Sequence, residues 1–262
     1  MKKIAPHLSQ VRTQISNIWL LEDLSGRKFL IDTGHRLERL SLVSQLWFRG
    51  IRHPGDLTAI LLTHRHSDHA GNAAFLGKRF GAPIICHAKD AEILMGRANP
   101  PSLLRDSKSP KRKGVRPFYE RWLCAFEDRA PSACEVDDAF KEGDWQWGFR
   151  VVPVLGHTEG SVMLLHEPSA TLFSGDAILV GDALSHVIGS RLRHPSKAME
   201  LRLAEPGFSL DAESCHRAVQ DFLRQLPLIA TLCPGHGVAL NGDIQARLQN
   251  LTPRKKTGTS LG

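Results

Sequence analysis

One short segment gathers four side chains of the kinds that bind metal ions. His64, His66, Asp68 and His69 fall within six residues, and the small pair Ala70-Gly71 follows them. A turn that leaves a strand can point such side chains at one spot, and imidazole with carboxylate suits zinc and other first-row metals. The lack of cysteine among these groups favours a catalytic over a structural metal site. A lone histidine would be interpreted as an ordinary surface residue, but this spacing predicts a metal site.

The wider segment resembles a known signature. Thr63-His64-Arg65-His66-Ser67-Asp68-His69-Ala70-Gly71-Asn72 is similar to the signature of the metallo-β-lactamase-fold hydrolases. The family's other motifs are matched, in the family's order, by Ile31-Asp32-Thr33-Gly34, Gly156-His157-Thr158-Glu159-Gly160-Ser161, Phe173-Ser174-Gly175-Asp176 and Pro234-Gly235-His236-Gly237. Five motifs in the correct order, spread over roughly residues 4–240, are far more specific than any one of them.

The resemblance implies a role for each candidate residue. The seven expected metal ligands form two sets and a bridge: His64, His66 and His157 on one metal, Asp68, His69 and His236 on a second, and Asp176 between the two. Asp32 would not touch metal but would hold the ligand loop in shape through hydrogen bonds, a support that metal sites commonly need. The implied cofactors are two divalent ions, with zinc favoured and iron or manganese as alternatives.

Two metals held close together provide a nucleophile for hydrolysis. Divalent cations about 3.5–4 Å apart share a water and lower its pKa from about 15.7 towards 7, so hydroxide exists at neutral pH. A metal-bridging hydroxide can attack a carbonyl or phosphoryl group while the metals stabilise the negative charge that develops. Asp68 is the candidate catalytic residue that receives and relays the proton. The expected activity is that of a dinuclear metal-dependent hydrolase.

Departures from neighbouring branches narrow the expected substrate. Metallo-β-lactamases have a cysteine or serine in the region of Asp176, and flavodiiron reductases have glutamate in place of His66, so neither activity is expected. Glyoxalase II enzymes continue into a helical domain after the last histidine, whereas only 25 residues follow Gly237 here, so glutathione thioesters are not expected as substrates. Persulfide dioxygenases use one iron, whereas both ligand sets are intact in this chain. Quorum-quenching lactonases are closer, but they place a tyrosine shortly after the bridging aspartate, where Ala177-Ile178-Leu179-Val180 follows Asp176 here. Tyr119 lies in the insertion, where a substitute for that tyrosine is the alternative and a packing residue is the favoured interpretation. We expect cleavage of an ester, thioester or lactone bond in a small molecule.

A phosphodiesterase or ribonuclease of the same fold is the alternative. Basic side chains cluster from Arg105 to Arg116 and could bind phosphates by counterion release. Blocks of like charge are commonly solvated surface, so nucleic acid is an open but disfavoured partner. A small-molecule substrate is favoured, and the net charge of +7 allows it to be anionic. His35, His186 and His194 are weaker candidates for groups near the site.

The elements that must position these residues alternate between strands and helices. Hydrophobic periodicity predicts short strands that run into the candidate ligands. The expected strands are 15–24, 28–31, 57–63, 83–86, 139–140, 145–155, 161–166, 171–173 and 229–233. The expected helices are 35–48, 72–80, 90–97 and 211–226. This order predicts an α/β fold, and the resemblance specifies a four-layered αββα sandwich of two mixed β-sheets flanked by helices.

Length and composition fit one domain. With 262 residues and 42% hydrophobic content, residues 1–251 are expected to form a single domain with one sizeable core. Prolines and basic residues at about 98–134 predict an insertion or lid, and 252–262 is expected to be a polar C-terminal tail. No signal peptide or transmembrane run is predicted, and five scattered cysteines fit a reducing compartment. We therefore expect a cytoplasmic protein with no membrane partner, and leave its oligomeric state open.

Overall fold

A seven-stranded sheet is built from the first half of the chain. Its strands lie in chain order: β1 (Lys2–Ala5), β2 (Leu8–Val11), β3 (Ile18–Glu22), β4 (Lys28–Ile31), β5 (Ala59–Leu61), β6 (Ile84–Cys86) and β7 (Asp138–Ala139). The strands from β1 to β4 pair antiparallel, and those from β4 to β7 pair parallel. The computed structural model describes residues 1–11, 13–103, 106, 108, 133–144, 146–181, 200–225, 227–242 and 244–251.

A second mixed sheet follows from the other half. Its strands, in spatial order, are β15 (Leu240–Asn241), β14 (Thr231–Pro234), β11 (Thr171–Gly175), β10 (Val162–His166), β9 (Phe149–Pro153) and β8 (Gly143–Asp144). Only β11 and β14 pair parallel among these neighbours. A separate antiparallel pair joins β12 (Ile178–Val180) to β13 (Leu201–Leu203).

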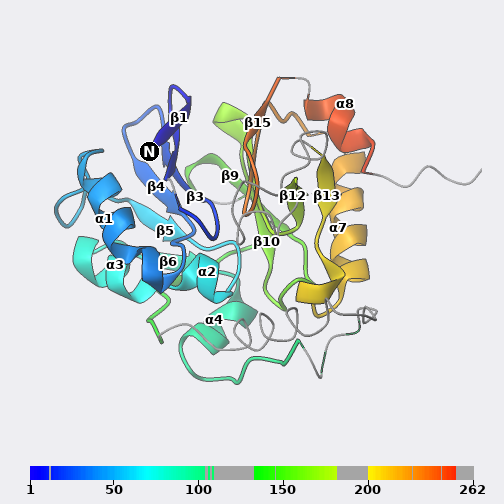
Figure 1. Cartoon of the computed structure of the whole chain (residues 1–262), viewed down its shortest axis with the longest axis horizontal. Helices are drawn as coiled ribbons and strands as arrows, with labels where there is room; N and C mark the ends of the chain where they lie inside the picture. The colour runs from blue at the N-terminus through cyan, green and yellow to red at the C-terminus, as the bar shows by residue number, and fades with distance from the viewer. Residues whose placement is uncertain are drawn as a thin grey trace, which may run out of the picture.

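Helices cover the outer face of each sheet (Figure 1). On the first sheet these are α1 (Arg39–Trp47), α3 (Ala73–Phe80) and α4 (Ala88–Leu94), and on the second α7 (Ala212–Arg224) and α8 (Ile244–Gln249). The short α2 (Ser67–Ala70) follows β5. The side chain of Asp211 starts α7 by accepting a hydrogen bond from the Ser214 N–H over 3.0 Å, and Gly81 ends α3 with a φ of 59°.

Alternating side chains build three apolar layers. In β4, Phe29 and Ile31 enter the core between the two sheets, while Leu30 packs under the helices of the first sheet. In β10, Leu164 faces the same central core and Leu165 packs with α7. Because successive residues of a strand point to opposite faces, both sheets are buried on both sides. The architecture is the expected αββα sandwich.

Most predicted elements are found close to their expected bounds. Strand β4 spans the predicted residues, and α3 and α7 each begin one residue later than expected. The β1–β2 hairpin was not predicted, because the exposed Lys2 and Lys3 of this edge strand give it no apolar alternation. The predicted helix at 35–48 begins instead with a 3-10 turn, Arg36–Glu38, before α1.

The remaining domain predictions fall on parts of the chain with few described residues. The insertion at about 98–134 and the tail at 252–262 lie mostly outside the described residues, so the domain limits stay a prediction. No helix in the described ranges is long and apolar enough to cross a membrane.

Candidate metal centre

The candidate ligands leave strands at one edge of the two sheets. The His64–His69 segment follows β5, Asp176 is the first residue after β11, and His236 comes two residues after β14 ends. His157 lies in the connection from β9 to β10. Since β11 and β14 are parallel neighbours, their carboxyl ends meet, and the ligands that follow them are brought together.

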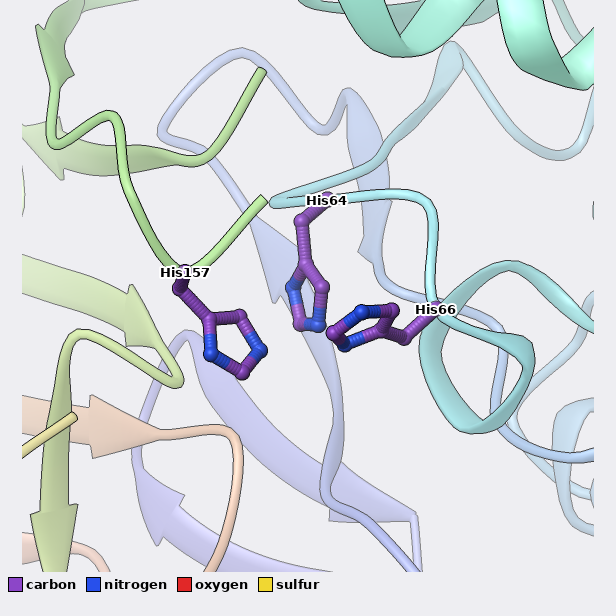
Figure 2. A group of neighbouring side chains, drawn as sticks. All are labelled: His64, His66 and His157. Atoms are coloured by element: carbon purple, nitrogen blue, oxygen red, sulfur yellow. The ribbon is translucent and has the colours of Figure 1, made fainter. Parts of the chain in front are cut away.

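Seven side chains converge into three overlapping groups. In each group the ligand-type nitrogen and oxygen atoms lie within 4.8 Å of one another. The groups are His64 with His66 and His157, His64 with His69 and Asp176, and Asp68 with His69 and His236. Figure 2 shows the three rings of the first group turned towards one another, from two separate segments of the chain.

Asp176 occupies the middle of the cluster. Its Oδ1 lies 3.3 Å from Nε2 of His69. Its Oδ2 lies 3.5 Å from Nε2 of His157 and 3.4 Å from Nε2 of His236. The carboxylate therefore reaches histidines of both expected ligand sets.

Four imidazole nitrogens enter the cluster with no hydrogen-bond partner among the described residues. They are the Nε2 atoms of His64, His66, His69 and His157, and all four are buried. A buried polar atom left without a partner costs about 1–3 kcal/mol, so convergent unpaired nitrogens indicate that something else satisfies them. Imidazole and carboxylate are ligands that zinc and its neighbours accept, so these residues fit divalent metals.

The opposite nitrogen of the ring is held by a neighbour in three of the histidines. Nδ1 of His64 lies 3.0 Å from Oγ1 of Thr63, which itself donates to Asp32 over 2.8 Å. Nδ1 of His69 lies 2.9 Å from Oδ2 of Asp32. Nδ1 of His157 lies 3.1 Å from Oγ of Ser209. These contacts favour the tautomer that protonates Nδ1 and leaves Nε2 free for metal.

Comparison with known proteins gives the cluster a family. A model of the metallo-beta-lactamase superfamily matches residues 11–236, which include every candidate ligand. The chain belongs to the metallo-beta-lactamase superfamily. The histidine and aspartate cluster of this superfamily fold implies divalent metals.

Individual relatives are distant. The probable metallo-hydrolase YflN of Bacillus subtilis (strain 168) is 23% identical over 188 residues, which cover 71% of this chain and 66% of that protein. The acyl-coenzyme A thioesterase MBLAC2 of Gallus gallus is 30% identical over 179 residues, 64% of this chain and 60% of that protein. A solved structure of TTHA1623 in a di-iron-bound form has a TM-score of 0.58 and 22% identity, covering 93% of this chain and 98% of that one.

The names of the two relatives both indicate hydrolysis, but only one of them names a substrate class. The chain spans slightly less than two thirds of YflN, at 66% of its length. The superfamily match and the hydrolase names of the relatives support a metal-dependent hydrolase. The solved structure shows a common fold.

One glycine of the superfamily motifs is required by close packing. A Cβ atom on Gly235 would lie 2.2 Å from Oδ1 of Asp176 and 2.7 Å from Cε1 of His69. Contacts this short do not occur, so any side chain would displace both candidate ligands. This explains why glycine stands directly before His236.

Burial keeps the first three histidines neutral. Desolvation lowers the pKa values of His64 and His66 well below the usual value and lowers that of His157 to about 4. A neutral imidazole has the free lone pair that a metal requires. This set can therefore accept a cation at neutral pH without first losing protons.

In the second ligand set, Asp68, His69 and His236, neighbouring carboxylates outweigh the effect of burial on the pKa values of the histidines. Burial lowers the pKa of His236, but Asp176 and Asp68 outweigh burial and raise it to about 10. Burial also opposes the charge on His69, whose pKa Asp68 and Asp176 nevertheless hold well above its usual value. Burial raises the pKa of Asp68, yet the charges of His69 and His236 bring it well below its ordinary range. These residues form ion pairs, with 3.1 Å between Nε2 of His236 and Oδ2 of Asp68.

Asp90 ties the two ligand loops together and is missing from the sequence-based candidates. Its buried carboxylate accepts hydrogen bonds from the N–H of Arg65 over 2.9 Å, the hydroxyl of Thr158 over 2.8 Å and the N–H of Gly160 over 3.0 Å. Arg65 lies inside the first ligand loop, and Thr158 directly follows His157. An acidic residue in the first turn of α4 was the available signal, but it indicated only the start of a helix. The sequence also gave no sign of Ser209.

Among the other sequence-based candidates, His35 is buried near the cluster: burial lowers its pKa, and the charge of Asp68 opposes that shift. Its Nδ1 accepts from the N–H of Leu37 over 3.3 Å, so the ring also caps the 3-10 turn before α1. Trp147 packs on Phe29 with ring centroids 5.1 Å apart. Candidates that fall outside the described residues are Tyr119, His186, His194 and all of the basic run except Lys108.

Proposed function

We propose that this chain is a dinuclear metal-dependent hydrolase that cleaves an ester, thioester or lactone bond in a small molecule. The ligands assigned to the two ions are His64, His66 and His157 for one, Asp68, His69 and His236 for the other, and Asp176 for both. The observation that carries this proposal is the convergence of four buried imidazole nitrogens without hydrogen-bond partners in the described part of the chain. Zinc is the proposed metal, and iron or manganese would take the same ligands.

The chain's own contribution is to position groups and to move a proton. When bound, two divalent ions lower the pKa of a water towards about 7 and polarise the substrate carbonyl. The side chains of Asp68, His236 and Asp176 are 10%, 11% and 13% exposed, whereas His69 is fully buried, so substrate approaches from the side that these three residues share. Asp68 is ionised there and receives the proton that the attacking water loses.

A carboxylic acid derivative is favoured over a phosphodiester. One similar protein is named as an acyl-coenzyme A thioesterase, which supports a thioester as the first substrate to test. Lys108, the basic-run residue that the structure describes, has its Nζ 3.7 Å from Oδ2 of Asp211. This cation already has an acidic neighbour. The phosphodiesterase alternative therefore rests on the charge of a segment outside the described residues.

A substrate panel tests the proposal. Protein loaded separately with zinc, iron or manganese is assayed against a lactone, an acyl-coenzyme A thioester, a p-nitrophenyl ester and bis(p-nitrophenyl) phosphate. We expect turnover of at least one of the first three, reduced about 100-fold or more in Asp176→Ala, since the charge-stabilising site is lost. The control His53→Ala, at an exposed histidine, should keep its activity. Turnover of the phosphodiester alone would replace our proposal with the phosphodiesterase.

A further inference from the structure

The helix α1 is apolar on both of its sides. Its inner side buries Leu42 and Leu46 in the core beneath the first sheet. Its outer side exposes 86% of Leu40, 81% of Phe48 and 44% of Trp47. In Figure 1, α1 lies on the outer side of the first sheet, away from the second sheet. Large apolar side chains on a helix are normally covered, and no described residue buries these three, which stand beside the exposed Ser41 and Ser44.

The exposed apolar residues form one surface. Leu37, in the 3-10 turn that leads into α1, is 78% exposed. Helical residues three, seven and eight positions apart share a side, so Leu37 and Leu40 line up with Trp47 and Phe48. We call these four residues the α1 outer face. Single exposed apolar residues are ordinary on proteins, but a contiguous group of large ones marks an interaction site.

Basic residues surround this face. Arg36, Arg49 and Arg52 are exposed at its two ends. The guanidinium carbon of Arg52 lies 5.1 Å from the centroid of the Trp47 ring, which leaves the cation beside the apolar surface. The acidic residue within this segment, Glu38, turns inward and accepts a hydrogen bond from the N–H of Gln14. The face therefore combines large apolar side chains with a positive border.

We propose that the α1 outer face docks on an anionic lipid surface. Leucine, tryptophan and phenylalanine beside arginine is the composition of helices that lie in the headgroup region of membranes. A net charge of +7 would draw the protein towards such a surface. In a two-fold dimer, this face would meet its own copy, and the arginines would meet arginines without acidic partners. The charges therefore favour lipid over a second copy of the chain.

Vesicle flotation of the full chain tests this proposal. Binding is compared between vesicles of phosphatidylcholine alone and vesicles that also contain phosphatidylglycerol. We expect binding only to the anionic vesicles, weakened by added salt because salt screens the arginine charges. Absence of binding to the anionic vesicles would overturn the proposal.

Matched variants locate the surface. The pair Leu40→Ser and Phe48→Ser should weaken vesicle binding by about tenfold or more, because apolar area no longer enters the lipid. The control pair Leu24→Ser and Leu228→Ser removes two side chains that are 98% and 79% exposed elsewhere, and should bind as the wild type does. Equal losses in the two pairs would show that the α1 outer face is not the docking surface.

A charge-matched pair separates local from overall attraction. Arg49→Gln should weaken binding about fivefold, while Lys141→Gln, which changes net charge equally at a distant exposed residue, should have a smaller effect. Equal effects would contradict a defined surface. Circular dichroism verifies that each variant is folded. A concentration-dependent dimer that Leu40→Ser and Phe48→Ser dissociate, with no vesicle binding, would instead identify the face as a contact between two copies.

Discussion

Three histidines of the candidate metal centre have Nδ1 next to a neighbouring polar side chain and Nε2 turned towards the cluster. Thr63, Asp32 and Ser209 contact the Nδ1 atoms of His64, His69 and His157, respectively. Each contact fixes the ring orientation and the proton position before a metal arrives. Folding therefore orders the histidine rings in advance, through contacts with residues that are not themselves expected to touch metal.

Asp32→Asn should weaken metal binding about 10- to 100-fold, the usual cost of losing a group that supports a ligand. Asparagine has almost the same shape but offers one acceptor oxygen, whereas Asp32 accepts from both Thr63 and His69. Affinity is measured by competition with a chromophoric chelator. Asp56→Asn, in a loop away from the cluster, serves as the control. An Asp32→Asn protein that binds metal as tightly as the wild type would contradict this role.

The two ligand sets should differ in how their metal affinity depends on pH. His236, with a pKa of about 10 in the metal-free protein, is protonated between pH 6 and 8, so metal must displace a proton there. His157, with a pKa of about 4, is already neutral over that range. Because metal displaces protons from both His69 and His236, raising the pH should strengthen binding to the second set by about tenfold per unit for each displaced proton, and change the first set far less. Metal titrations at pH 6 and pH 8 measure this, and parallel changes at both sites would refute it.

Residues near the ligands differ in how far the sequence could reveal them. The His64–His69 cluster was predicted from residue types and spacing, whereas His157, Asp176, His236 and Asp32 were predicted through the motifs of the family resemblance. Ser209 lies 52 positions from the histidine that it contacts, and Asp90 lies 25 positions from Arg65. Such partnerships depend on how loops pack after folding. No local pattern records them.

At the level of elements, α4 links two ligand loops through Asp90. This carboxylate reaches the backbone of Arg65 on one side and Thr158 and Gly160 on the other. A Cβ atom on Gly160 would lie 2.6 Å from the Asp90 carboxyl carbon, so the loop approaches as closely as glycine permits. The position of α4 thus sets the spacing between the His64–His66 loop and the His157 loop.

Asp90→Ala should lower the free energy of unfolding of the metal-free protein by about 3 kcal/mol, because it strands buried donors without an acceptor. Asp90→Asn keeps one carbonyl oxygen and should lose less. The control Glu92→Ala removes a side chain that is 51% exposed on the same helix, and should cost at most about 0.5 kcal/mol. Urea unfolding measures all three. A loss for Asp90→Ala no larger than that for Glu92→Ala would exclude the linking role.

Elements with strong apolar periodicity were predicted, and the strands that were missed are short or lie at an edge. Strands such as β4 and β10 and the helix α7 bury a regular set of side chains, which leaves a clear pattern. The strands β12 and β13, of three residues each, were not predicted. The helix α2 is four residues long and carries Asp68 and His69, so its sequence reflects ligand chemistry more than helix packing.

At the level of the whole molecule, both sheets contribute residues to the candidate metal centre. The first sheet supplies the His64–His69 segment, and the second supplies His157, Asp176 and His236. The sheets are also connected by the side-chain amide of Asn17, which donates to the carbonyl of Pro234 over 2.9 Å. The sequence could indicate this four-layered arrangement only through the family resemblance, because periodicity gives strands and helices but not which sheet each strand joins.

Removing the metals should therefore lower the stability of the entire chain. Ions that bind only the folded state stabilise it by about 4 kcal/mol when present at 1,000 times their dissociation constant. We expect a chelator to lower the thermal unfolding temperature by several degrees and to abolish turnover, with both restored by zinc. His66→Ala, which lacks one ligand, should respond less to the chelator. An unfolding temperature that the chelator leaves unchanged in the wild type would argue against ions that bridge the sheets.

The metal content of the purified chain tests the central claim most directly. Protein produced with ample zinc, iron and manganese is analysed by elemental mass spectrometry, alongside folded His66→Ala and Asp176→Ala variants. Our account predicts two divalent ions per wild-type chain, bound by the seven clustered side chains, and fewer in each variant. One ion per chain, or none, in the wild type would contradict it.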